Sequence, residues 1–248
     1  IFMKLIDRLL PMTARDAGGQ MRRSILRAVS AALFVLTTLV TPQIGTDTAS
    51  IRQPTAAAEV RELSASELAR VSLLQAPQQV VAVFEKPTPA PWQPTDELAL
   101  ALDGVQDPGN VGTIIRLADW FGIHNILCSP TTADAFAPKV VQATMGALTR
   151  VKIHRLSDTV TFLKGFSGSR LGTFLGGEDL YTTALPTGKD EPVLLIMGNE
   201  GQGIHPDLEP HIDRRITIPP YPAENSHTES LNVAIATALL LGELRRRL

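Results

Sequence analysis

Short apolar runs alternate with helical patterns from residue 97 to Leu248. The apolar runs, rich in aliphatic and β-branched residues, predict strands at residues 97–102, 124–129, 151–156, 170–175, 192–197 and 216–218. The patterns between several of them predict helices at residues 110–121, 138–147 and 157–164, and a long last helix from Ser230 to Leu248. Because strands that alternate with helices form parallel sheets, the expected fold class is α/β, with a mostly parallel sheet and helices on both faces.

The N-terminal region, residues 1–90, is expected to form a small α/β domain that precedes this sheet. An apolar stretch at residues 25–40 follows Arg22 and Arg23, as in a signal peptide, but it lies inside the chain and is interrupted by Arg27. It is too short and too interrupted to span a membrane. We therefore expect a helix and a strand there, in a cytoplasmic protein without a membrane segment.

Local signals toward the end of this region are clearer. Ser64 and Glu67 have the spacing of a capping box, which predicts a helix start, and the apolar run at residues 80–84 predicts a strand. Four prolines follow between Lys86 and Pro94. Since a proline-dense polar segment forms a stiff spacer, we place a domain boundary at residues 86–96.

The composition narrows the possible classes of protein but does not choose one of them. The chain is 44% hydrophobic and 19% charged, which is typical of a folded soluble protein. A net charge of −2 gives no sign of a nucleic-acid partner, although a local basic patch matters more than the total. The single cysteine, Cys128, excludes an internal disulfide framework and is expected to be a small buried hydrophobe. No histidine, cysteine or carboxylate set has metal-ligand spacing, so no metal site is expected.

The loop after the first of these strands is the first candidate site. Pro108 and Gly109 predict a turn, and Asn110 is placed to cap the helix that follows. In an open α/β sheet, ligands bind at such loops, beyond the carboxyl ends of the strands. Taken alone, Asn110 is most simply a helix cap.

The helix after this loop is amphipathic and should end near Gly122, a residue typical of helix C-termini. Its apolar stripe has helical spacing and consists of Val111, Ile114, Ile115 and Ala118. Arg116 lies off this stripe. Taken alone, Arg116 is most simply a solvated surface arginine.

A glycine-rich loop follows the strand predicted at 192–197. It runs from Gly198 through Glu200 and Gly201 to Gly203, and its three glycines allow a ligand to approach the backbone closely. The spacing is not that of the dinucleotide-binding fingerprint. Without other evidence, the segment is most simply a turn that carries a loop carboxylate.

A third polar segment joins the last strand to the last helix. Ile218 and Pro219 end the strand, and Ser230, Leu231 and Asn232 open the helix. Ser230 is most simply its N-cap, and Asn232 falls within the first turn, where amide donors favour an anion or a polar ligand edge.

Together these three segments resemble the SpoU, or TrmH-like, family of RNA ribose 2′-O-methyltransferases, in the SPOUT class. Its first motif has an asparagine followed six residues later by an arginine, here Asn110 and Arg116. The second ends a strand with Gly-x-Glu-Gly, here from Gly198 to Gly201. The third is Ile-Pro, a loop and Ser-Leu-Asn-Val, here ending at residues 230–233. The resemblance covers residues 97–248, whereas residues 1–45 match the family's small substrate-binding domain poorly.

The resemblance implies a C-terminal trefoil knot and S-adenosylmethionine as the methyl donor. It places cofactor contacts at Gly198, Gly201, Ile218 and Leu231. It places the catalytic residues at Asn110, Arg116, Glu200, Ser230 and Asn232. The implied reaction is methyl transfer to a ribose 2′-hydroxyl of rRNA or tRNA, by a homodimer whose active site lies at the subunit interface. Two alternatives stay open: a non-catalytic RNA-binding relative with this fold, and a different α/β transferase or hydrolase that uses the Glu200 loop.

Overall fold

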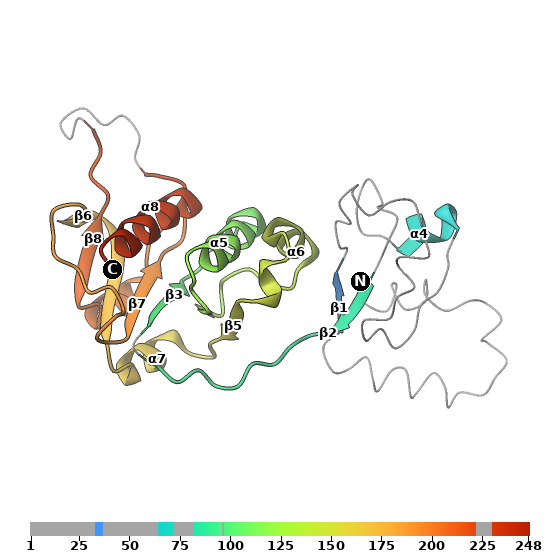
Figure 1. Ribbon diagram of the computed structural model, residues 1–248, viewed down its shortest axis with the longest axis horizontal. Coiled ribbons are helices and arrows are strands. Elements are labelled where there is room, and N and C mark those ends of the chain that lie inside the picture. Colours follow the sequence, from blue (N-terminus) through green and yellow to red (C-terminus); the bar gives the residue numbers. More distant parts are fainter. Residues whose placement is uncertain (1–32, 37–63, 72–81, 96, 222–229) are drawn as a thin grey trace. The chain divides into compact units, whose positions relative to one another are not determined.

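The computed structural model describes residues 33–36, 64–71, 82–95, 97–221 and 230–248 (Figure 1). The chain divides into two compact units, residues 1–87 and residues 88–248. Within the described ranges, no helix has the length and apolar character needed to cross a bilayer.

In the first unit, the structure describes one helix and two paired strands. Strands β1 (Leu33–Leu36) and β2 (Ala82–Glu85) are antiparallel, and helix α4 spans Ala65–Val71. The predicted capping box is confirmed, because Ser64 Oγ accepts from the Glu67 amide at 3.3 Å and Glu67 Oε2 accepts from the Ser64 amide at 2.9 Å. The helix expected just before β1 lies outside the described residues.

The second unit is built on a six-stranded sheet in which every described pairing is parallel. Its strands are β3 (Leu98–Leu102), β4 (Asn125–Cys128), β5 (Lys152–Arg155), β6 (Ser169–Asp179), β7 (Val193–Met197) and β8 (Arg214–Thr217). Their order across the sheet is β5-β4-β3-β7-β6-β8. The α/β expectation is confirmed, and β3 and β7 form the middle pair.

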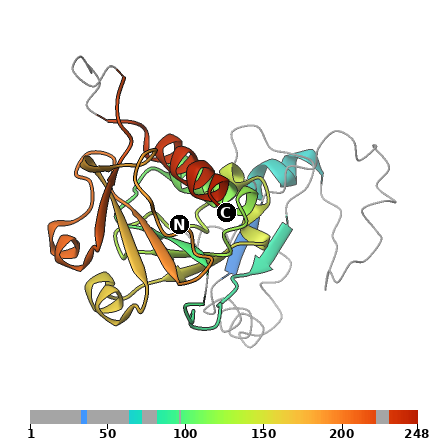
Figure 2. The ribbon, with the colours of Figure 1, turned by 60° about the vertical axis from the view of Figure 1, so that its left-hand side comes forward.

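Helices cover both faces of this sheet (Figures 1 and 2). The helical segments are α5 (Pro108–Trp120), α6 (Pro138–Thr144), η2 (Ala147–Thr149), α7 (Thr159–Gly165), η3 (Pro206–His211) and α8 (Val233–Arg246). Helices α5, α6 and α8 lie on one face, and α7 lies with η3 on the other (Figure 2). Successive side chains of a strand point to opposite faces, so each strand contributes to the apolar core on both sides of the sheet. On one side, Ala99 and Ala101 of β3 pack in one cluster with Leu163 of α7 and Leu208 of η3.

The observed ends of all four predicted helices differ from those expected, and α7 spans Thr159–Gly165 instead of 157–164. Asp107 rather than Asn110 caps α5, so this helix begins at Pro108. Asn232 rather than Ser230 caps α8. Helix α6 stops at Thr144, before the predicted residue 147, because Met145 and Gly146 adopt left-handed φ angles of 51° and 88°.

The proline-rich segment is docked on the second unit rather than free. The Trp92 ring stacks on Phe166 with centroids 5.9 Å apart, and its indole nitrogen donates to Glu97 Oε1 at 2.8 Å. Phe162 of α7 completes the aromatic group, 6.3 Å from Trp92. A bulky ring whose N–H has a hydrogen-bond partner holds an extended chain at low entropic cost. Trp92 therefore fixes the position of this segment just before β3.

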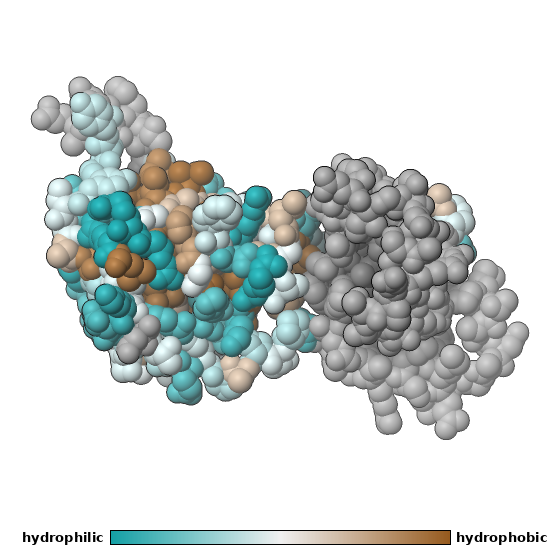
Figure 3. Space-filling model, viewed as in Figure 1, coloured by the Kyte–Doolittle hydropathy of each residue, from teal (hydrophilic) through white to brown (hydrophobic). Residues whose placement is uncertain are grey.

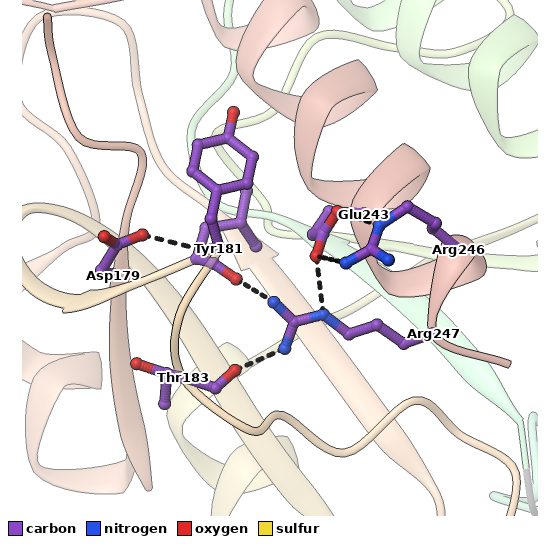
Figure 4. Close-up of polar contacts among 7 residues, drawn as sticks. Asp179, Tyr181, Thr183, Glu243, Arg246 and Arg247 are labelled. Carbon is purple, nitrogen blue, oxygen red and sulfur yellow. Dashed lines mark hydrogen bonds and ion pairs between the residues drawn. The ribbon is translucent and has the colours of Figure 1, made fainter.

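An ionic network ties the last turn of α8 to the segment after β6 (Figure 4). Glu243, only 8% exposed, accepts from Arg246 at 2.6 Å and from Arg247 at 2.9 Å. Arg247 also donates to the carbonyl oxygens of Leu180 and Thr183. These hydrogen bonds, first that of Arg246 and then that of Arg247, lower the pKa of Glu243 from 4.5 to about 2.

The low pKa of Glu243 makes the stability of this contact depend on pH. A carboxyl whose folded-state pKa is depressed contributes fully above its unfolded value and loses that contribution as pH falls through the folded one. We expect Glu243→Gln to be less stable than wild type at neutral pH, and the gap to narrow between pH 4.5 and about 2. Urea denaturation of both proteins across that range measures the gap. A gap that does not change with pH would contradict the prediction.

Candidate active site

The candidate site lies where the strand order reverses. From β3 the chain moves outward through β4 to β5, crosses to β6 on the other side of β3, and then comes back to β7, which lies next to β3. The loops that follow β3 and β7 therefore leave the same edge of the sheet side by side, the usual ligand position in an open parallel sheet. They carry the first and second motifs.

Asn110 reaches from the first of these loops to the second. Its backbone amide is already satisfied by Asp107 Oδ1 at 2.8 Å, which leaves its side chain available for other contacts. The Asn110 Nδ2 group donates to Glu200 Oε1 at 3.0 Å, across 90 residues of sequence. Asn110 is therefore a link between the two loops and not the cap of α5.

Asn232 joins the third motif to this pair. Its Oδ1 caps α8 by accepting from the amides of Ala234 and Ile235 at 3.0 Å and 3.2 Å, while its Nδ2 donates to Asn110 Oδ1 at 3.0 Å.

The direction of this chain of hydrogen bonds is fixed at both ends. An ionised carboxylate only accepts, so Asn110 must turn its NH₂ group toward Glu200 and its oxygen toward Asn232. Backbone amides only donate, so Asn232 must turn its oxygen toward α8 and its NH₂ group toward Asn110. The two requirements agree. The helix N-terminus, Asn232, Asn110 and Glu200 thus form one polarised chain, which we call the amide chain.

The four residues expected to contact the cofactor differ in their surroundings. A Cβ atom on Gly198 would lie 2.3 Å from the carbonyl carbon of Gly203, so only glycine fits where the loop folds back on β7. Gly201 is exposed, and its amide donates to Asn199 Oδ1 at 2.9 Å. Ile218 is half-buried just after β8, and Leu231 is 48% exposed beside Asn232.

Two of the predicted site residues do not join the amide chain. Arg116 lies on the exposed side of α5 and makes no hydrogen bond or ion pair with any residue that the structure describes. Ser230 is exposed and lies two residues before Asn232, the cap of α8. No hydrogen bond joins Ser230 to Asn110 or Glu200. Both side chains are therefore available to other molecules.

The described part of the chain holds no group of three His, Cys, Asp or Glu side chains that could coordinate a metal ion. Cys128 is buried, as expected, and burial raises the pKa of its thiol to about 12. A buried thiol with that pKa stays protonated at neutral pH and behaves as a small hydrophobe.

Comparison with known proteins identifies the family. The model of the SpoU rRNA Methylase family matches residues 97–242, which contain all three motifs. The chain belongs to the SpoU rRNA methylase family.

Relatives within this SpoU family cover most of the chain. This chain is 34% identical over 192 residues to the 23S rRNA (guanosine(2553)-2′-O)-methyltransferase RlmP of Bacillus subtilis, and the match covers 74% of this chain and 71% of RlmP. A TrmH-family structure from Porphyromonas gingivalis has a TM-score of 0.73 at 42% identity, over 91% of this chain and 93% of its own. An AdoMet-bound rRNA methyltransferase structure from Sinorhizobium meliloti has a TM-score of 0.67 at 34% identity, over 75% and 70%.

Some residues of this SpoU site were missed from the sequence. Asp107 caps α5, and Asp103 and Asn199 hold the two loops together. Asp107 carried a recognisable signal, because an N-cap residue directly before a proline is typical of helix starts. Asp103 and Asn199 carried none, because their partners are backbone groups distant in sequence.

Asn232 should be needed for stability as well as for the site. We expect Asn232→Ala to lose about 1 kcal/mol of unfolding free energy, because two amides of the first turn of α8 lose their acceptor. Urea denaturation measures the loss. Ser230→Ala is the matched control and should stay within about 0.5 kcal/mol of wild type. A larger loss in Ser230→Ala than in Asn232→Ala would show that the wrong residue has been assigned as the cap.

Proposed function

We propose that this protein transfers a methyl group from S-adenosylmethionine to a ribose 2′-hydroxyl of rRNA or tRNA. The observation that carries the proposal is the amide chain, which brings Asn110, Glu200 and Asn232 of three separate motifs together in a member of the SpoU family. Its Bacillus relative is named as a 2′-O-methyltransferase of 23S rRNA.

The residues around the amide chain fit S-adenosylmethionine. When bound, this cofactor supplies a methyl group on a positively charged sulfur. Gly198, Gly201, Ile218 and Leu231 would hold it. Partly exposed apolar side chains at Ile218 and Leu231 suit a nucleoside's ring and ribose, and the exposed carboxylate of Glu200 suits the positive charge of such a ligand.

Arg116 is proposed to act on the RNA. In the reaction the 2′-oxygen would form a bond to the methyl carbon while the carbon–sulfur bond breaks, which would leave a neutral thioether, and the hydroxyl proton would pass to solvent water. Arginine stays protonated in proteins, so it is a poor base. As a fork on a substrate phosphate it orients the ribose and stabilises the developing alkoxide. Ser230, which is exposed within the third motif, would complete the set of polar groups.

The remaining assignments follow the same family reasoning. The first unit would bind substrate RNA, and the protein would act in the cytoplasm. The C-terminal part of the chain would form a trefoil knot that contains the second and third motifs. The course of the chain supports the knot. After β8 at the sheet edge, the chain returns to α8, which lies against α5. Arg247, just after α8, donates to carbonyl oxygens of the segment that joins β6 to β7.

The protein is also proposed to form a homodimer through the outer surface of α5 and α8. Large apolar side chains are exposed there, with Trp120 at 83%, Ile235 at 55% and Leu239 at 40%. Figure 3 shows apolar residues gathered over this part of the second unit. Two helices with a shared apolar surface are typical of a homodimer interface. Arg116 is exposed on the same helix as Trp120, which would place it at such an interface.

Arg116→Ala should abolish methyl transfer while leaving cofactor affinity nearly unchanged, because the side chain has no structural partner among the described residues. Calorimetric titration of S-adenosylmethionine and transfer of a tritiated methyl group to RNA measure the two properties. Arg116→Lys keeps the charge without the fork, and a fully active lysine variant would argue against a bidentate contact. Equal loss of binding and transfer in Arg116→Ala would count against the assignment. A wild-type protein that does not bind S-adenosylmethionine would favour a non-catalytic RNA-binding relative.

Trp120→Glu should convert the dimer to a monomer, because a carboxylate in an apolar interface loses hydration without gaining a partner. Light scattering coupled to size-exclusion chromatography measures the mass. Leu175→Glu is the matched control, since Leu175 is 77% exposed on β6. It should leave the mass unchanged. A wild-type protein that is monomeric at micromolar concentration would refute the proposed interface.

A further inference from the structure

The loop that carries Glu200 is organised by the side chain before it. Asn199 Oδ1 accepts from the amides of Gly201 and Gln202 at 2.9 Å and 3.0 Å, which folds the loop around this one oxygen. The backbone groups of Asn199 and Gly203 exchange two hydrogen bonds, at 2.8 Å and 2.9 Å, and these close the loop at its base. The backbone amides of Gly201, Gln202 and Gly203 are therefore all held by Asn199.

The same side chain fastens the loop to the segment just after β3. Asn199 Nδ2 donates to the carbonyl oxygen of Gly104 at 2.7 Å. Gly104 is itself firmly held, because its amide lies 2.9 Å from Ser129 Oγ and 3.1 Å from Thr132 Oγ1, and all three residues are buried. The anchor of the Glu200 loop is thus a rigid point at the end of β3.

A second tie comes from Asp103, which is 7% exposed. Its Oδ2 accepts from the amide of His205 at 2.7 Å, just beyond the glycine loop. The loop is therefore attached to the end of β3 on both sides of Glu200. Between these ties, Glu200 is exposed, and its one side-chain hydrogen bond to another described residue is the one to Asn110.

We propose that Asn199 is a positioning residue that acts on methyl transfer through Glu200. Three of the six residues from Gly198 to Gly203 are glycine, so without the Asn199 contacts this backbone has wide conformational freedom. The carboxylate of Glu200 would then meet Asn110 only part of the time, and the amide chain would lose its acceptor end. This inference rests on the proposed function, because it needs Glu200 to matter for catalysis.

A double-mutant cycle tests the inference in the full-length protein. Single-turnover transfer of a tritiated methyl group is measured on the ribosomal or transfer RNA transcript that wild type labels, for Asn199→Ala, Glu200→Ala and the double variant. We expect Asn199→Ala to lower the rate about 10- to 100-fold, the size of effect that misplacing a reacting group produces. In the Glu200→Ala background, the same substitution should change the rate less than about twofold, because the group it positions is already gone.

A loss of fold stability alone would give a different pattern. Asp158→Ala is the matched control, since Asp158 Oδ1 also accepts from two backbone amides, those of Val160 and Thr161, at the start of α7. It should lower the thermal midpoint by a similar amount and leave the rate unchanged. If Asn199→Ala does not fold, Asn199→Asp takes its place with the same expectations, because it keeps the acceptor oxygen and loses the donation to Gly104.

The outcomes separate the inference from the proposed function. A wild-type rate in Asn199→Ala, or a further tenfold loss in the double variant beyond Glu200→Ala, overturns the positioning role while the methyltransferase assignment stands. A wild-type rate in Glu200→Ala overturns the proposed role of Glu200, and the inference with it.

Discussion

The hydrogen bond between Asn110 and Asn232 is the contact on which the arrangement of the site depends. It joins the first helix after β3 to the last helix of the chain, across 122 residues of sequence. Each partner is oriented from outside, Asn110 by the carboxylate of Glu200 and Asn232 by the amides of α8. Since neither amide can rotate without breaking a second bond, both side chains are already oriented in the structure without a ligand, as catalysis by placement would require.

The parallel sheet makes this contact possible. The six described strands of this sheet run the same way, so their carboxyl ends share one edge, and the middle position of β3 and β7 brings the first two motifs together. The third motif reaches them because α8 lies against α5. The starts of these helices are joined by Asn110 and Asn232, and Arg245 near the end of α8 donates to the Phe121 carbonyl at the end of α5. The two helices therefore run parallel, with both N-termini at the site.

The sequence allowed the strands, the apolar stripe of α5 and the end of that helix to be predicted. Periodicity reports burial directly, and Val111, Ile114, Ile115 and Ala118 are all fully buried. Gly122 follows α5 with a left-handed φ of 66°. Helix starts were harder, because two capping residues of similar propensity stand near each start, as Asp107 and Asn110 do. Tertiary contacts decide between such pairs, and here Glu200 takes up the side chain of Asn110. The supports at Asp103 and Asn199 bond to distant backbone atoms, which leave no pattern in sequence.

These residues differ in how much each one contributes to holding the fold together. Asn232 caps a helix of fourteen residues and also orients Asn110, so any change at Asn232 alters stability and site geometry together. Arg116 contributes no bond within the described part of the chain, so the fold does not fix its position. A long side chain without an internal partner carries a large conformational entropy, which must be lost when it engages a ligand. The fold thus holds the amide chain rigid and leaves the guanidinium free to be ordered by what binds there. Under the proposed function, the carboxamides would define where a ligand sits, and the arginine would respond to its charge.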